Sequence, residues 1–148
     1  MEIVEISCLR KLPRSLSVTE IRSVTKKILK GVTDCKSYEI SIIVTDDLMI
    51  QKLNKAKRKK NKPTDVLSFP VSEKDIFLPH RILGEVVISI ETAVVQAEKI
   101  GHSLKEEFYR LLVHGILHLL GYDHEKNDFH ARQMRKKEDE CLAIIFGD

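Results

Sequence analysis

Residues 114–124 read His-Gly-Ile-Leu-His-Leu-Leu-Gly-Tyr-Asp-His, a mostly apolar segment that carries three histidines. In an α-helix, residues four apart lie one turn apart on the same face, so His114 and His118 point the same way. Gly121 can adopt the left-handed conformation that ends a helix, which would return His124 toward that face. Three neutral imidazoles without a fourth protein ligand describe an open zinc site. We therefore predict one zinc ion per chain, bound by these three histidines.

The alternative is that the three histidines are ordinary core residues, whose ring nitrogens are satisfied by backbone groups or water. Their neighbours in the sequence are mainly leucine and isoleucine. Burying three imidazoles there without a shared partner would leave polar atoms unpaired, at a cost of about 1–3 kcal/mol each. A shared metal ion removes that cost, which favours the ligand interpretation. Asp123 has two possible roles: it orients one of the imidazoles, or it caps the turn.

Length and composition indicate one soluble domain, residues 1–148, with a single hydrophobic core. No apolar run approaches the roughly 20 residues of a membrane span, and the N-terminus lacks the basic and apolar regions of a secretory signal. Cys8, Cys35 and Cys141 are odd in number and widely spaced, as expected of reduced thiols. These features predict a cytoplasmic protein without a membrane partner.

Hydrophobic periodicity predicts strands and helices that alternate along the chain and end in three successive helices. Strands are predicted at residues 2–6, 37–44, 63–70 and 82–90, with a loop at 71–81. Helices are predicted from Val18 to a stop at Gly31, from a cap at Thr45 or Asp46 through Leu53, from Glu91 to Gly101, from a cap at Ser103 through the histidine segment, and from about Asp128 onward. This order suits an α+β fold, a single layered domain with a small mixed β-sheet packed by helices.

Two of the predicted strands have distinguishing features. The strand at 63–70 is bracketed by Pro63 and Pro70, and it suits a sheet edge beside a cleft because proline cannot donate to a strand ladder. The strand at 82–90 is nearly continuously apolar, which predicts a position inside the sheet. Gly84 in this strand indicates either a β-bulge or a close approach of another backbone.

Six cations fall within eight residues between the second predicted helix and the predicted edge strand. They are Lys55, Lys57, Arg58, Lys59, Lys60 and Lys62. Most charge runs of this kind are solvated faces. This run leads directly into the segment predicted to border a cleft, however, and lysine and arginine contacts with phosphate dominate nucleic-acid affinity. The cluster is therefore a candidate surface for a polyanion.

Four segments together resemble the bacterial YbeY endoribonucleases over about residues 38–142. They are the histidine motif His114–His124, the pair Asn54 and Arg58, the stretch Pro63–Pro70, and Leu83-Gly-Glu-Val-x-Ile-Ser. The resemblance implies a zincin-like, zinc-dependent, single-strand-specific endoribonuclease of the cytoplasm. It further implies maturation of the 3′ end of small-subunit ribosomal RNA and ribosome quality control, with the small ribosomal subunit and its assembly factors as partners and no action on DNA.

By the same resemblance, the zinc ligands are His114, His118 and His124, and Arg58 is the functional arginine. We predict that Arg58 stabilises charge on the phosphoryl oxygens during cleavage, and that Lys57, Arg58 and Lys59 bind the RNA backbone. Zinc can activate water near neutral pH, so no glutamate base is required. Whether water or the 2′-hydroxyl attacks stays open. Glu85 departs from the family pattern, in which an aspartate is usual.

Two other function classes fit part of the sequence. The histidine spacing also resembles that of metzincin peptidases, but in those enzymes a glutamate general base follows the first histidine, where this chain has Gly115. A non-catalytic RNA-binding protein stabilised by zinc is the third class, although structural zinc sites normally have four protein ligands.

Overall fold

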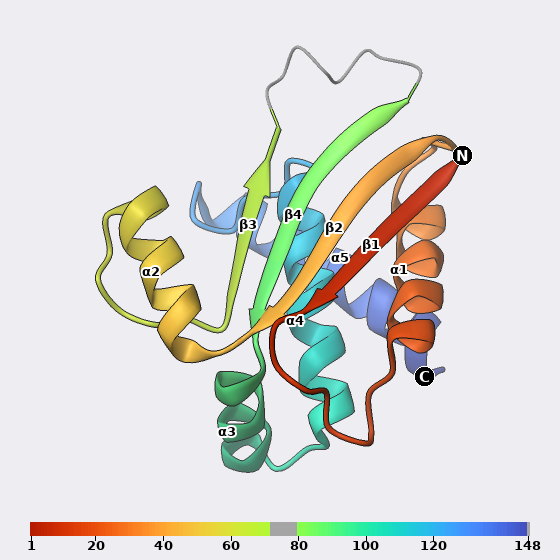
Figure 1. Ribbon diagram of the computed structural model, residues 1–148. Helices are drawn as coiled ribbons and strands as arrows, with labels where there is room; N and C mark the ends of the chain where they lie inside the picture. The colour runs from red at the N-terminus through yellow and green to blue at the C-terminus, as the bar shows by residue number, and fades with distance from the viewer. Residues whose placement is uncertain (72–79, 148) are drawn as a thin grey trace.

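The computed structural model describes residues 1–71 and 80–147 and shows a four-stranded sheet flanked by helices (Figure 1). Its elements are β1 (Glu2–Cys8), α1 (Val18–Val32), β2 (Tyr38–Thr45), α2 (Asp47–Arg58), β3 (Val66–Pro70), β4 (Arg81–Ser89), α3 (Ile90–Ile100), α4 (Leu104–Leu119) and α5 (Asp128–Phe146). The predicted α+β class and element order are confirmed. Most of the predicted loop at 71–81 lies outside the described residues, and Arg81 already belongs to β4.

The strand order in the sheet is β1-β2-β4-β3, and the sheet is mixed as predicted. β1 and β4 both pair in parallel with β2, whereas β3 pairs antiparallel with β4 at the sheet edge. The interior position predicted for β4 and the edge position predicted for β3 are confirmed. β3 begins at Val66 rather than at residue 63, because the preceding residues form the loop that borders the site described below.

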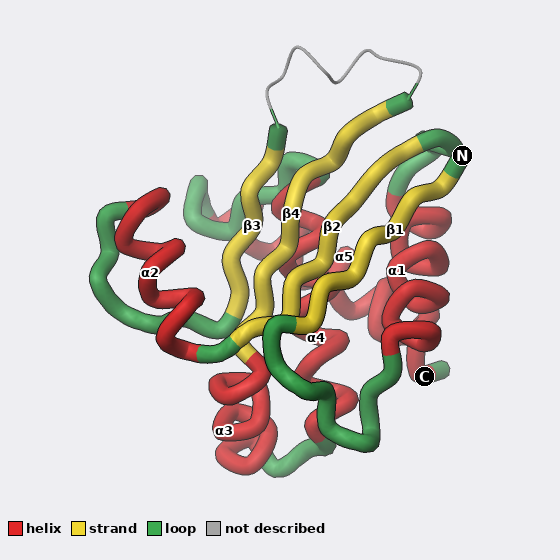
Figure 2. Tube along the Cα trace, in the orientation of Figure 1, coloured by secondary structure: helices red, strands yellow, loops and turns green. Residues whose placement is uncertain are grey.

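Helices pack against both faces of the sheet, in unequal amounts. Successive residues of a strand point to opposite faces, so Val86 and Val87 of β4 report on the two sides. Val86 belongs to the large core beneath α1, α4 and α5; in Figure 2, α4 and α5 lie behind the sheet and α1 lies beside β1. Val87 instead joins a small cluster with Leu67 of β3 and Ile50 of α2. α4 is therefore held by the main core, and α2 by a much smaller one.

Gly84 lies at a β-bulge and also at a close approach of another backbone, the two possibilities predicted for it. The register between β2 and β4 shifts between Glu39 and Ile40, which pair with Ile82 and Gly84 and leave an extra residue on β4. The φ angle of Gly84 is +128°, and a Cβ atom there would lie 2.2 Å from the carbonyl oxygen of Phe69. The position therefore combines a bulge with a close approach of β3, and only glycine fits both demands.

Side-chain caps define most helix starts, and those at Asp46 and Ser103 are as predicted. Ser17, Asp46 and Ser103 each accept a hydrogen bond from the backbone N–H three residues later, and Gly101 ends α3 in the left-handed conformation. Among the helices of the described segments, none is long and apolar enough to cross a membrane.

The predicted helix stop at Gly31 is wrong. α1 continues to Val32 and is followed by Thr33 in extended conformation. A Cβ atom at position 31 would lie 3.0 Å from Cδ1 of Ile144. Gly31 does not take the left-handed conformation that would end the helix; it faces α5, where the flexible end of the half-exposed Ile144 side chain lies.

Candidate active site

α4 and the turn after it position the three histidines. The helix is capped by Ser103 and buries most of its length, with His114 and His118 one turn apart on the same side. After Leu119 the chain reverses through Gly121, whose φ is +100°. The N–H of Gly121 donates to the carbonyl of His118, and this tight turn returns His124 to the other two imidazoles, as predicted.

The three imidazoles form a compact donor set. One ring nitrogen from each of His114, His118 and His124 lies within 4.8 Å of the others, and the ring centroids are 4.9–5.3 Å apart. Tetrahedral zinc with N ligands requires N–N separations of roughly 3.3 Å, so modest side-chain rotation would close the set around one ion. Burial, followed by the neighbouring imidazoles, lowers the pKa of His118, which favours the neutral, metal-binding form. The residues therefore fit the predicted metal.

A carboxylate stands behind one of these imidazoles. Nδ1 of His114 lies 2.8 Å from Oε1 of Glu138 on α5, an arrangement that fixes ring orientation and tautomer in metal sites. Asp123, one candidate for such a role, instead accepts a hydrogen bond of 3.0 Å from the N–H of Glu125 and caps the turn. The sequence analysis missed Glu138. Its acidic neighbours Asp139 and Glu140 on the same helix look equivalent in the sequence.

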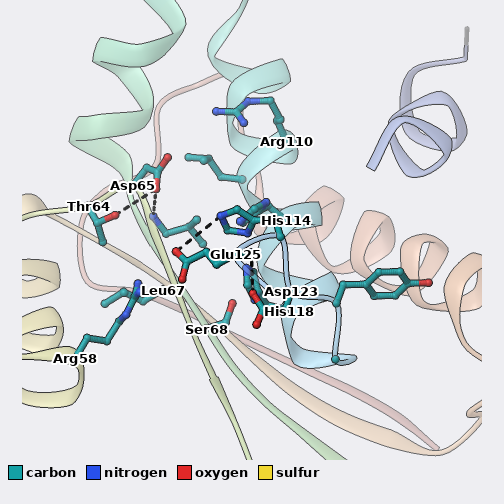
Figure 3. Close-up of a pocket in the computed structure, with 15 residues that line it drawn as sticks. Arg58, Thr64, Asp65, Leu67, Ser68, Arg110, His114, His118, Asp123 and Glu125 are labelled. Atoms are coloured by element: carbon teal, nitrogen blue, oxygen red, sulfur yellow. Dashed lines mark hydrogen bonds and ion pairs between the residues drawn. The ribbon is translucent and has the colours of Figure 1, made fainter. Parts of the chain in front are cut away.

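The histidines border a cavity of about 660 Å³ that is also lined by Arg58, at the end of α2 (Figure 3). α2 ends there because Lys59 takes the left-handed conformation, with φ of 59°. Asn54, which is buried, donates from Nδ2 to the carbonyl of Lys62 at 2.9 Å and shapes the loop that follows. Lys57 and Lys59 are exposed and do not line the cavity in the described structure. Their predicted contact with RNA stays a prediction.

The loop before β3 supplies another wall of the cavity, including Asp65. One oxygen of Asp65 accepts from the N–H of Val66 at 2.8 Å and from the hydroxyl of Thr64 at 3.4 Å. The other accepts from Nε2 of Gln96 on α3 at 3.2 Å. The carboxylate thus accepts hydrogen bonds on both oxygens, and it ties the loop before β3 to α3.

Arg110, one turn before His114 on α4, is a further cavity residue that the sequence analysis missed. Its guanidinium pairs with the fully buried carboxylate of Glu107, from Nε at 3.0 Å and from Nη2 at 2.6 Å. The hydrogen bond with Glu107 is the main reason that the pKa of Arg110 is raised. The spacing of three between the two residues is a sequence signal for this pair.

Gly115 faces the sheet and not the cavity. A Cβ atom there would lie 2.6 Å from Cγ1 of Val86, and the hydroxyl of Ser68 donates to the carbonyl of Gly115 at 2.9 Å. A glutamate at this position would have to enter the packed contact between α4 and β4. The general base of a metzincin peptidase therefore has no place in this arrangement, which weakens the peptidase alternative.

Comparison with known proteins agrees with this geometry. The family model described as Endoribonuclease YbeY matches residues 8–145. The Endoribonuclease YbeY of Leptospira biflexa is 54% identical over 111 residues, which cover 75% of this chain and 72% of that protein. That of Persephonella marina is 50% identical over 131 residues, covering 84% and 86%. The solution structure of TM1509 from Thermotoga maritima matches with a TM-score of 0.64 and 25% identity, covering 99% of this chain and 90% of that one.

Proposed function

This chain belongs to the Endoribonuclease YbeY family, and from that premise we propose that it is a zinc-dependent endoribonuclease that cleaves single-stranded RNA. The observation that carries the proposal is the meeting of three imidazoles within 4.8 Å in a cavity that Arg58 also lines. A donor set of three histidines leaves a position for water or substrate, as in catalytic rather than structural zinc sites.

The proposed mechanism divides the work between the metal and the chain. Zinc bound by His114, His118 and His124 would supply a Lewis acid and would lower the pKa of a bound water, which is one of the two candidate nucleophiles beside the RNA 2′-hydroxyl. Arg58 offers a guanidinium to the non-bridging oxygens of the scissile phosphate, where negative charge builds up in the transition state. Lys57 and Lys59, beside it on the surface, attract the RNA backbone. Because Gly115 carries no side chain, the chain contributes no base from that position.

The biological setting is part of the same proposal. We propose that the substrate is ribosomal RNA, with cleavage in maturation of the 3′ end of the small-subunit RNA and in ribosome quality control. The partners would be the small ribosomal subunit and its assembly factors, in the cytoplasm, with no action on DNA. Residues 1–148 would act as one nuclease domain. The support for this setting is the family resemblance.

The test is to incubate metal-loaded protein with single-stranded RNA, duplex RNA and an unstructured polypeptide. We expect cleavage of the single strand, strong loss of cleavage in His114→Ala and Arg58→Glu, and retention in Arg135→Glu. The last variant makes the same charge change at an exposed position of α5 away from the cavity. Cleavage of the polypeptide but not of RNA would overturn the proposal, and RNA cleavage undiminished in both site variants would indicate a contaminating nuclease.

The product ends identify the attacking group. A 2′,3′-cyclic phosphate would show that the RNA 2′-hydroxyl attacks, since hydrolysis by water forms no such ring. Analysis of short products by mass spectrometry distinguishes the two results.

A further inference from the structure

Two guanidinium groups reach the cavity from different elements. Arg58 comes from the end of α2 and Arg110 from α4, and both line the space that contains the three histidines. In Figure 3 they approach His114 from different sides. The proposed function uses Arg58 and assigns nothing to Arg110.

The guanidinium of Arg110 is held in place by the buried carboxylate of Glu107. Glu107 has a side-chain exposure of 0% and accepts two hydrogen bonds from Arg110 in a parallel, bidentate arrangement. Nε2 of His102 lies 2.8 Å from the same carboxylate, on Oε1. Glu107 is buried and is bonded to both Arg110 and His102, so its carboxylate is fixed in place. The bidentate pair therefore holds the guanidinium of Arg110 in one orientation before any ligand binds.

Arg110 still has donors to offer. Guanidinium carries five N–H groups, and Glu107 takes one from Nε and one from Nη2, which leaves three. The side chain is 35% exposed, in keeping with its place in the cavity wall. The two other carboxylates that act on its charge, Asp65 and Glu138, are engaged by Gln96 and His114. The free N–H groups therefore suit an incoming anion such as a phosphate oxygen.

We propose that Arg110 binds a second backbone phosphate of the RNA, distinct from the phosphate at Arg58, with Glu107 as its positioning residue. This inference rests on the proposed function, because it takes single-stranded RNA as the occupant of the cavity. The strand then runs past the histidines with its scissile phosphate at Arg58 and another backbone phosphate at Arg110. A dinucleotide, with one phosphate, cannot use both contacts.

The test removes the charge of Arg110 without leaving a buried carboxylate unpaired. Glu107→Gln is compared with the double variant Glu107→Gln/Arg110→Met, and Arg135→Met is the matched loss of an exposed cation. Affinity of the metal-loaded protein for a single-stranded oligoribonucleotide is measured against salt concentration, and gel analysis confirms that the RNA stays intact during each measurement. We expect the log–log slope to fall by about 0.7 in the double variant relative to wild type. In cleavage assays KM should rise more than kcat falls.

A second experiment locates the phosphate. Single methylphosphonate groups are placed along the oligonucleotide, each removing one backbone charge. We expect one position that weakens binding to wild type but not to the double variant, and a different position that weakens binding to wild type but not to Arg58→Ala. Equal slopes and equal KM values in wild type, Glu107→Gln and the double variant would overturn the inference, leaving the ion pair a purely structural contact. The same phosphate for both arginines would also overturn it.

Failure of the proposed function gives a separate result. A wild-type chain that binds RNA with a steep salt dependence but never cleaves it contradicts the nuclease, while the slopes still decide the role of Arg110. A wild-type chain that binds no RNA contradicts both.

Discussion

The two helices that bring arginine to the cavity differ in how they are held. α4 lies in the main core, and its polar cavity residues are supported from behind by carboxylates, Glu138 for His114 and Glu107 for Arg110. α2 rests on a small cluster around Ile50, and its many charges are exposed. α4 therefore holds the reacting groups in fixed positions, and the exposed charges of α2 attract the substrate. Arg58, at the end of α2, is the residue of that helix that lines the cavity.

Arg58 should differ most from its basic neighbours in its effect on cleavage. We expect Arg58→Ala to lower kcat by on the order of 100-fold, the usual effect of losing one donor that stabilises transition-state charge. Lys57→Ala and Lys59→Ala should mainly raise KM, because these residues lie outside the cavity. Steady-state cleavage of a single-stranded oligonucleotide measures both constants. If the three variants had the same ratio of kcat loss to KM gain, Arg58 would not differ from its neighbours.

Glu138 variants test whether the carboxylate bonded to His114 supports metal binding. Glu138→Ala removes the acceptor of His114 and should weaken metal affinity by roughly 10–100-fold, the usual effect of losing an outer carboxylate. Glu138→Gln keeps an oxygen at the same place and should weaken it less. Competition with a chromophoric zinc chelator measures the affinity directly, and Asp139→Ala on the exposed side of α5 is the matched control. Unchanged affinity in Glu138→Ala would remove this carboxylate from the site.

Gly115 tests how closely α4 lies on the sheet. In Gly115→Ala the new methyl group would contact Val86 at 2.6 Å, so we expect a loss of about 1–3 kcal/mol in the free energy of unfolding. Adding Val86→Ala should return part of the loss specific to this contact. Urea denaturation of the three variants gives the values. If the losses in unfolding free energy of the two single variants simply added in the double variant, the clash with Val86 would not be the cause of the destabilisation.

Glu20 on α1 is expected to give the smallest effect. Its pKa is lowered, chiefly by the hydrogen bond from the hydroxyl of Tyr109 on α4 and also by Lys105. A lowered folded pKa stabilises the protein above the unfolded value, about 4.3 for glutamate, and the contribution is lost as the pH falls through the folded pKa. Because the side chain is 40% exposed, we expect less than about 1 kcal/mol.

Urea unfolding of wild type and Glu20→Gln at pH 7 and pH 3 provides the measurement. The advantage of wild type should be present at pH 7 and shrink at pH 3. A difference of the same size at both pH values would contradict the assigned ion pair and hydrogen bond.

Features set by local sequence could be predicted, whereas features set by packing between distant elements could not. Helical spacing and one glycine turn predicted that His114, His118 and His124 would meet, because those rules act within a single local segment. Glu138 and Arg110 were missed, since their roles depend on the packing of α5 and on a buried carboxylate. The stop predicted at Gly31 failed because the presence of a glycine does not show whether it takes the left-handed conformation, and this one does not.

The measurement that tests the central claim most directly is the zinc content of the purified chain. We expect one zinc ion per chain in wild type, none in His118→Ala, and one in His130→Ala, which removes a partly buried histidine of α5 outside the triad. Elemental analysis after dialysis against metal-free buffer gives the numbers. Equal metal content in wild type and His118→Ala would contradict the account.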